Sequence, residues 1–266
     1  MDDRPIGVFD SGVGGLTVVR SLIDLLPNES IVYYGDTARG PYGPRARDEV
    51  RGFVDEIAST LVRDGVKMLV VACNSASSAG LDHIKDNYPD IPILEVIEPA
   101  VRSAVRATRN RRIGVIGTEL TIASKAYDRA VALTRENVEL FPRACPRFVE
   151  FVERGQTGGA ELIVAHEYLQ PLVESKVDTL ILGCTHYPLL TGVISFVMGR
   201  DVVLVSSAEE VARDVFALLT ERDVARGTDA PPTYRFLSSG ERERFESLGR
   251  RFLGPEIAKV EEHPWI

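Results

Sequence analysis

The sequence has few cysteines and no long hydrophobic run, and each shortage excludes a class of protein. Its 266 residues contain three cysteines that are far apart, which does not fit the disulfide framework of a small secreted domain. No apolar stretch approaches the length of a membrane span, and the acidic N-terminus lacks the hydrophobic core of a signal peptide. We therefore expect a cytoplasmic protein with no membrane partner.

Positive charge and paired metal ligands are also scarce. The net charge is −8, and the densest basic stretch, residues 109–112, is too short to indicate direct binding of nucleic acid. None of the five lysines lies in the motifs described below, so a pyridoxal cofactor held by a Schiff base is not expected. The cysteines and histidines do not fall into paired ligand spacings, so we expect no metal site.

Strand-like and helix-like segments alternate along the chain. The strand-like segments are short apolar runs bounded by turn signals, which is typical of buried parallel strands. The first half is predicted to contain strands at residues 6–10, 30–35, 68–72 and 92–97, with helices at 15–26, 44–64 and 76–87 between them. This alternation predicts an α/β fold in which helices flank a parallel sheet.

The second half of the chain repeats the first after about 110 residues, a period that indicates duplicated domains. The three matched pairs are residues 6–11 with 113–118, 66–75 with 177–186, and 93–96 with 203–206. We expect two pseudo-symmetric α/β domains with the active site in the cleft between them. The first domain is expected to comprise residues 1–97 and a C-terminal return, 208–266, and the second domain residues 98–207.

Two cysteines occupy matching places in this repeat. Cys73 and Cys184 each follow a predicted strand, at the sheet edge where α/β proteins bind ligands. Polar residues come directly after each: Asn74 after Cys73, and Thr185 and then His186 after Cys184. Helix amides, hydroxyls and imidazoles tune the acidity of thiols, so the pattern predicts two acid/base groups that face one substrate.

Two more loops at this edge carry polar residues. Asp10 and Ser11 lead into a glycine-rich turn, residues 12–15, which suits an anion at a helix N-terminus but matches neither the dinucleotide fingerprint nor the P-loop. The loop at residues 34–43 can cover the pocket, with Tyr42 or a backbone amide touching the ligand.

Paired thiols suit one reaction in particular. Inversion at a carbon next to a carboxylate needs a base on one face and an acid on the other, and two groups of one type allow both directions. Asp10 near Cys73 and His186 near Cys184 could move protons or set the charge of the thiols. Backbone amides at helix starts would stabilise the developing negative charge.

Taken together, the motifs closely resemble those of bacterial glutamate racemase. The resemblance rests on residues 9–15, 34–43, 72–77 and 183–188, and it extends over nearly the whole chain. It implies a cofactor-independent enzyme of two α/β domains that interconverts L- and D-glutamate, supplies D-glutamate for peptidoglycan, and forms a homodimer.

The same resemblance assigns roles to residues. Cys73 and Cys184 would be the acid/base pair, assisted by Asp10, His186 and, from a Val-Glu-x-Gly element, Glu153. The substrate-binding residues would be Asp10, Ser11, Tyr42, Gly43, Asn74, Ser75, Thr185 and His186. One position departs from the pattern: Ser75 stands where the family usually has threonine, which keeps the hydroxyl and loses a methyl group.

Other readings of the sequence stay open. A sister enzyme of the same architecture could act on aspartate, hydantoins or malonates. A non-catalytic anion-binding module could use only the glycine turn, and its cysteines would then be dispensable. A thiol redox protein would need Cys73 and Cys184 close enough to form a bond, which leaves no room for a substrate between them.

Overall fold

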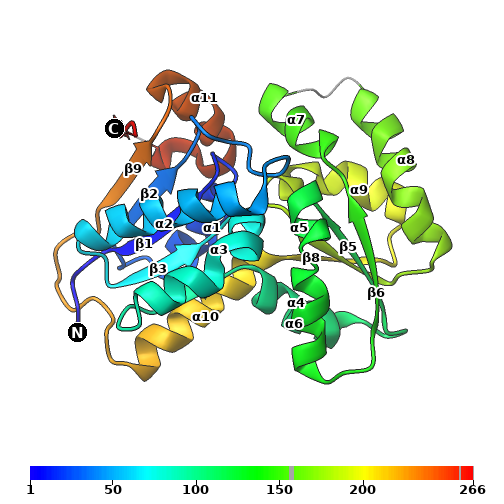
Figure 1. The fold of residues 1–266 in the computed structure, drawn as a ribbon, viewed down its shortest axis with the longest axis horizontal. Helices are drawn as coiled ribbons and strands as arrows, with labels where there is room; N and C mark the ends of the chain where they lie inside the picture. The colour runs from blue at the N-terminus through cyan, green and yellow to red at the C-terminus, as the bar shows by residue number, and fades with distance from the viewer. Residues whose placement is uncertain (156–158, 258, 266) are drawn as a thin grey trace.

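Two parallel sheets form the framework of the structure, a computed structural model that describes residues 1–155, 159–257 and 259–265 (Figure 1). The first sheet contains β1 (Ile6–Asp10), β2 (Ile31–Gly35), β3 (Met68–Val71), β4 (Ile93–Glu95), β9 (Tyr234–Ser238) and β10 (Val260–Glu262). The second contains β5 (Arg112–Gly117), β6 (Glu139–Ala144), β7 (Thr179–Gly183) and β8 (Val203–Ser206).

The strand orders of the two sheets repeat each other. The first sheet has the order β10-β9-β2-β1-β3-β4 and the second the order β6-β5-β7-β8, and all their pairs are parallel. Thus β5, β7 and β8 take the places of β1, β3 and β4, which are the three strands that the sequence repeat had matched. The predicted fold class is confirmed, and the C-terminal strands β9 and β10 extend the first sheet.

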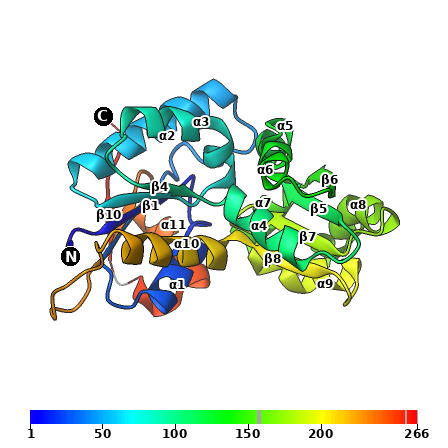
Figure 2. The same ribbon diagram turned by 90° about the horizontal axis from the view of Figure 1, so that it is seen from below.

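Helices cover both faces of the first sheet (Figure 2). One face packs against α1 (Leu16–Leu25), α10 (Ser207–Glu221) and α11 (Arg242–Leu253), and the other against α2 (Arg47–Arg63) and α3 (Asn74–Asn87). Alternate residues of β1 divide between these layers: Ile6 and Val8 join the first core and Phe9 the second, as the two-residue period of a strand requires.

The second sheet is covered in the same way. Its first face packs against α4 (Ile97–Ala107) and α6 (Ala126–Thr134), with the short helix α5 (Glu119–Ala123) following β5. The other face packs against α7 (Arg147–Arg154), α8 (Ala160–Glu174), the 3-10 turn η1 (Tyr187–Leu190) and α9 (Thr191–Met198). Among the described helices, none is both long and apolar enough to cross a membrane.

The chain passes from the first sheet to the second between β4 and β5, and it returns between β8 and β9 (Figure 1). The strand predicted at 92–97 is shorter than expected, because the chain turns into α4 at Ile97. The carboxylate of Glu95 accepts hydrogen bonds from the backbone N–H groups of Ile97 (2.6 Å) and Glu98 (2.7 Å), which begins the helix.

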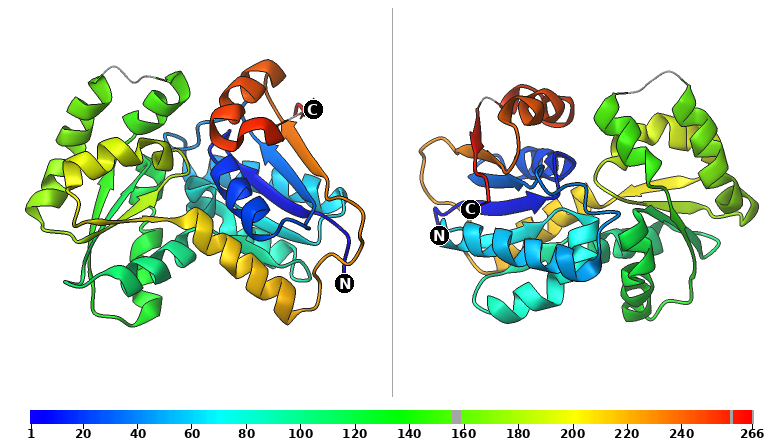
Figure 3. Two further views of the ribbon diagram at one scale, coloured as in Figure 1. Left: turned by 180° about the vertical axis from the view of Figure 1, so that it is seen from behind. Right: turned by 45° about the horizontal axis from the view of Figure 1, so that its top comes forward.

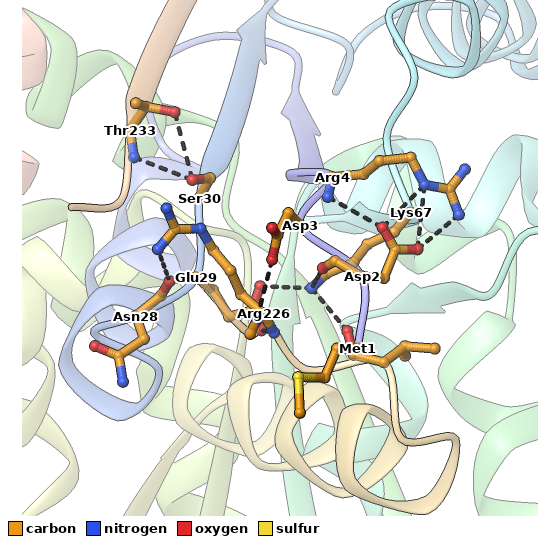
Figure 4. A network of polar contacts seen from close by, with 12 residues as sticks. Met1, Asp2, Asp3, Arg4, Asn28, Glu29, Ser30, Lys67, Arg226 and Thr233 are labelled. Atoms are coloured by element: carbon orange, nitrogen blue, oxygen red, sulfur yellow. Dashed lines mark hydrogen bonds and ion pairs between the residues drawn. The ribbon is translucent and has the colours of Figure 1, made fainter. Parts of the chain in front are cut away.

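The end of the first sheet opposite the cysteines is held by a buried ion pair (Figure 4). Lys67 Nζ lies 2.6 Å from Glu29 Oε2 and donates to the carbonyls of Asp2 and Val224, at 2.9 Å each. Glu29 Oε1 accepts from the backbone N–H of Arg226 at 2.8 Å. The pair therefore ties the N-terminus and the connection before β9 to the start of β3, on the same lobe as both chain termini (Figure 3).

Candidate active site

Cys73 and Cys184 line a single cavity between the two sheets. Cys184 comes directly after β7, and Cys73 comes after β3 with one residue between them. Both therefore lie at the carboxyl edge of their sheet. The other lining residues are Ser11, Pro41, Tyr42, Gly43, Asn74, Ser75, Thr118, Val149, Thr185 and His186. The volume of this cavity is about 20 Å³, which has room for roughly one water molecule.

The first thiol belongs to the N-cap of α3. The Cys73 Sγ accepts a hydrogen bond from the backbone N–H of Ala76 at 3.4 Å and donates to Ser11 Oγ at 3.6 Å. Burial, together with the nearby negative charge of Asp10, raises the pKa of Cys73 to about 12, although the N–H of Ala76 acts in the opposite direction. Without a substrate, Cys73 is therefore a neutral thiol at physiological pH.

The second thiol has an imidazole beside it. The Cys184 Sγ lies 3.8 Å from Nδ1 of His186, whose Nε2 lies 3.5 Å from Oε1 of Glu153. Burial acts to lower the pKa of His186, but its contacts with Cys184 and Glu153 and the charge of Asp10 outweigh burial and raise that pKa to about 10. The contact with His186 in turn lowers the pKa of Glu153. These contacts keep a proton on His186 next to Cys184.

Asp10 links the two halves of the site. It is fully buried at the end of β1, and its Oδ1 accepts from the backbone N–H of Gly12 (2.8 Å) and from Ser11 Oγ (3.4 Å). Its Oδ2 accepts from Thr185 Oγ1, in the other half, at 3.1 Å. Burial raises the pKa of Asp10, against the opposing effects of His186 and of these hydrogen bonds.

The glycine-rich turn allows this close approach between the halves. A Cβ on Gly14 would overlap Thr185 Oγ1 and would lie 2.7 Å from His186 Nδ1, so only glycine fits there. A Cβ on Gly12, by contrast, would meet nothing within 4 Å. The structure gives Gly14 a packing role, and the binding of an anion by this turn stays a prediction.

Asn74, which lines the cavity, also contacts the second half. Its Nδ2 donates to the hydroxyl of Tyr127 at 2.9 Å, and its buried Oδ1 has no hydrogen-bond partner among residues 1–155, 159–257 and 259–265. Because a tyrosine hydroxyl can donate as well as accept, the Asn74 amide can turn over and present N–H donors to a carboxylate in the cavity.

Three lining residues were not among the predicted site residues: Thr118, Val149 and Pro41, of which Pro41 lies in the loop that was expected to cover the pocket. The hydroxyl of Thr118 lies 2.8 Å from that of Ser75, across the boundary between the halves. Thr118 is the counterpart of Ser11 in the internal repeat, so the repeat contained the signal that could have found it. Val149 lies on α7, and no motif in the sequence marks it.

The loop after β2 closes another side of the cavity. The hydroxyl of Tyr42 donates to the carboxylate of Asp36, so this hydroxyl is already engaged although Tyr42 lines the cavity. The carbonyl of Gly43 accepts from the backbone N–H of Leu120 at 3.0 Å, and a Cβ on Gly43 would lie 2.9 Å from Thr118 Cβ. Backbone groups of this loop are thus held close to the second half.

A larger cavity of about 330 Å³ adjoins the site and shares Ser11 and Pro41 with it. Glu153 lines this second cavity from α7, and Arg244 lines it from α11, with 3.7 Å between Arg244 Nη2 and Glu153 Oε2. All eleven predicted site residues therefore lie in or against the small cavity: nine line it, Asp10 lies behind Thr185, and Glu153 lies behind His186.

Comparisons with known proteins agree closely. A family model described as Asp/Glu/Hydantoin racemase matches residues 6–215. A glutamate racemase from Acidothermus cellulolyticus is 57% identical over 98% of this chain and 99% of its own length. The glutamate racemase isoform RacE1 from Bacillus anthracis has a TM-score of 0.93 at 39% identity, covering 100% of this chain and 98% of that one. A glutamate racemase from Francisella tularensis, solved in complex with D-glutamate, has a TM-score of 0.93 at 37% identity, covering 99% and 98%.

Proposed function

This chain belongs to the Asp/Glu/Hydantoin racemase family, and we propose that it interconverts L- and D-glutamate without a cofactor, with Cys73 and Cys184 as the acid/base pair. The observation that carries the proposal is the single cavity lined by both thiols, each presented by the equivalent strand of a like sheet. One thiolate removes the α-proton from one face of the amino acid, and the opposite thiol returns a proton to the other face.

Each thiol has its own route for a proton. The Cys184 sulfur lies 3.8 Å from His186 Nδ1, and His186 Nε2 lies 3.5 Å from Glu153 Oε1. On the other side, Ser11 Oγ lies between Cys73 and Asp10, 3.6 Å from the Cys73 sulfur and 3.4 Å from the Asp10 carboxylate. We assign Asp10, His186 and Glu153 to setting the protonation of the thiols.

Polar groups that line the cavity supply the contacts for the amino acid. Five of the lining residues have polar side chains and follow strands at this edge, and Tyr42 and Gly43 line the cavity from the loop after β2: the five are Ser11, Asn74, Ser75, Thr185 and His186. Amides at the start of α3, where Cys73 is the N-cap, lie where negative charge develops as the α-proton leaves. Glutamate is the substrate named for the relatives at 57% and 37% identity, and the second of these binds D-glutamate.

The site has to open for a substrate to bind. A cavity of about 20 Å³ is far smaller than an amino acid, so the lining residues from the two halves must separate and close again. We propose that the domains are residues 1–97 with 208–266, and residues 98–207, and that they move about the two connections near 97 and 208. Both connections join a strand to a helix, β4 to α4 and β8 to α10.

The test uses solvent deuterium. L- or D-glutamate is incubated with the enzyme in D2O without added cofactor, and chirality and α-deuterium are followed over time. Inversion accompanied by deuterium at the α-carbon is expected for glutamate, whereas aspartate run in parallel should react far more slowly. Equal or faster reaction of aspartate would reject glutamate as the substrate.

Single-thiol variants sharpen the test. Cys73→Ala and Cys184→Ala should each abolish racemisation, and each should retain deuterium exchange into one enantiomer only, the opposite one in the two variants. The matched control is Cys145→Ala, since Cys145 is also buried but does not line the cavity. Racemisation that survived the loss of either Cys73 or Cys184 would contradict the two-thiol mechanism.

We further propose a cytoplasmic homodimer that supplies D-glutamate for peptidoglycan. The three cysteines are free thiols in the described structure, which suits a reducing compartment. The dimer and the use of the product are proposed from family membership.

A further inference from the structure

Asp36, at the end of β2, is a fully buried carboxylate with four side-chain donors. Its Oδ2 accepts from the Tyr42 hydroxyl and from Arg39 Nε at 2.7 Å. Its Oδ1 accepts from Ser239 Oγ at 2.6 Å and from Trp265 Nε1 at 2.8 Å. Two of the donors belong to the loop after β2, one follows β9, and one lies in the C-terminal tail.

The tail is itself held against the edge of the first sheet. The backbone N–H of His263 donates to the carbonyl of Ser238 at 2.8 Å, and the carbonyl of His263 accepts from the Tyr34 hydroxyl at 2.9 Å. The guanidinium carbon of Arg39 lies 3.7 Å from the centroid of the Trp265 ring, a cation–π contact. Trp265 thus touches both members of the Asp36–Arg39 ion pair.

A short path leads from this tail to the substrate cavity. Tyr42, which bonds Asp36, and the next residue, Gly43, both line the cavity, and Gly43 also bonds the second half through Leu120. If the donor from Trp265 is lost, the buried carboxylate of Asp36 is left with fewer partners, so its other contacts must rearrange. Those contacts include the one that places Tyr42.

We propose that Trp265 is a positioning residue for the loop carrying Tyr42 and Gly43, and that it acts through Asp36 and Arg39. The inference rests on the proposed function in that it takes this loop to contact the amino acid. It assigns to the C-terminal return a part in substrate binding as well as in completing the sheet.

A positioning role for Trp265 and a purely stabilising role predict different effects on catalysis. A displaced loop weakens contacts that are made to the substrate both before and during the reaction, so KM rises more than kcat falls. A tail that only adds stability would lower the melting temperature and leave KM of the folded enzyme unchanged. Trp265 is the only tryptophan of the chain, so its fluorescence reports directly on this place.

The experiment compares Trp265→Ala and Trp265→Phe with Glu261→Ala. Phenylalanine keeps a ring for Arg39 but has no N–H for Asp36. Glu261 lies in β10, shortly before Trp265, and pairs with Arg235 at 2.8 Å on the surface. Glu261→Ala therefore controls for the loss of a C-terminal contact that does not involve Asp36. Racemisation kinetics for both enantiomers, and hydrogen exchange of the backbone amides of residues 38–40, 42 and 43, are measured on each protein.

We expect kcat/KM to fall about tenfold in Trp265→Ala, mostly through KM, with faster amide exchange in the loop. Trp265→Phe should change in the same direction by a smaller factor, and it serves as the test if the alanine variant does not fold. The wild-type fluorescence should change on addition of D-glutamate. Unchanged KM and unchanged loop exchange in both tryptophan variants, even with a lower melting temperature, would overturn the proposal. A wild-type enzyme that is inactive on glutamate would instead reject the proposed function. The amide hydrogen exchange of the loop would still decide whether Trp265 positions it.

Discussion

Replacing Gly14 with alanine should disable the site while leaving the fold intact. The added Cβ would overlap Thr185 Oγ1 and would lie 2.7 Å from His186 Nδ1 and 2.8 Å from His186 Cε1. Ordinary contact begins at about 3.4 Å, so the imidazole must move by about 0.7 Å and the threonine hydroxyl by more. Both residues are buried, so neither can turn aside into solvent.

The size of the effect follows from what these residues hold. A displacement on the order of 1 Å in a catalytic group costs roughly a hundredfold in rate, so we expect kcat/KM of Gly14→Ala to fall about a hundredfold. Overpacking of this kind costs about 1–3 kcal/mol of stability, which should lower the melting temperature without abolishing folding. The hydrogen bond from Thr185 to Asp10 is expected to break or lengthen as the threonine moves.

The assay is polarimetric racemisation of both enantiomers, with thermal unfolding followed in parallel. Gly12→Ala is the matched control, since it adds the same methyl group to the same turn where nothing lies within 4 Å, and its kcat/KM should stay near the wild-type value. Wild-type kinetics in Gly14→Ala would refute the reasoning, because it would mean that Thr185 and His186 need not stay where the structure places them. Equal losses in the two variants would show instead that the turn tolerates no side chain at all.

Two further predictions follow from the buried charges. Glu153→Gln removes one of the groups that raise the pKa of His186, so His186 should lose its proton at a lower pH, and the alkaline limb of the kcat/KM profile should move to lower pH. Glu150→Gln, on the exposed face of the same helix, is the control and should leave this limb in place. An alkaline limb that does not move in Glu153→Gln would count against the role assigned to His186. Lys67→Met leaves Glu29 buried without its partner, which should cost about 3–5 kcal/mol in urea denaturation with little change in kcat, and adding Glu29→Leu should recover much of that loss.

Much of the fold could be predicted because its signals are local. Buried parallel strands are continuous apolar runs, and matching runs in the two halves predicted which strands of the two sheets correspond. The strand β6 was not predicted, because it is partly exposed and contains Pro142, which a parallel sheet tolerates only at its edge. Its place beside β5 makes it the outer strand of the second sheet, where no continuous apolar run is needed.

The candidate site was predictable where its residues follow strands. Cys73 and Cys184 come at carboxyl edges, and the parallel arrangement of the sheets brings such edges to one side. The part played by the C-terminal return could not be read in this way. Trp265 and Asp36 are far apart in sequence, and their contact depends on β9 pairing with β2, which no local pattern specifies.

The duplicated architecture supplies two similar thiols, yet their surroundings make them chemically unlike. Cys73 is buried beside Asp10, which raises its pKa to about 12, whereas Cys184 lies next to a protonated His186. Since enantiomers have equal free energies in water, the ratio of kcat/KM for the two directions must equal one, whatever the acidity of each thiol. The difference between the thiols can therefore appear only in kcat and KM separately, where a higher kcat in one direction is matched by a proportionally higher KM. An enzyme built by duplication can for this reason let its two halves diverge without favouring either enantiomer at equilibrium.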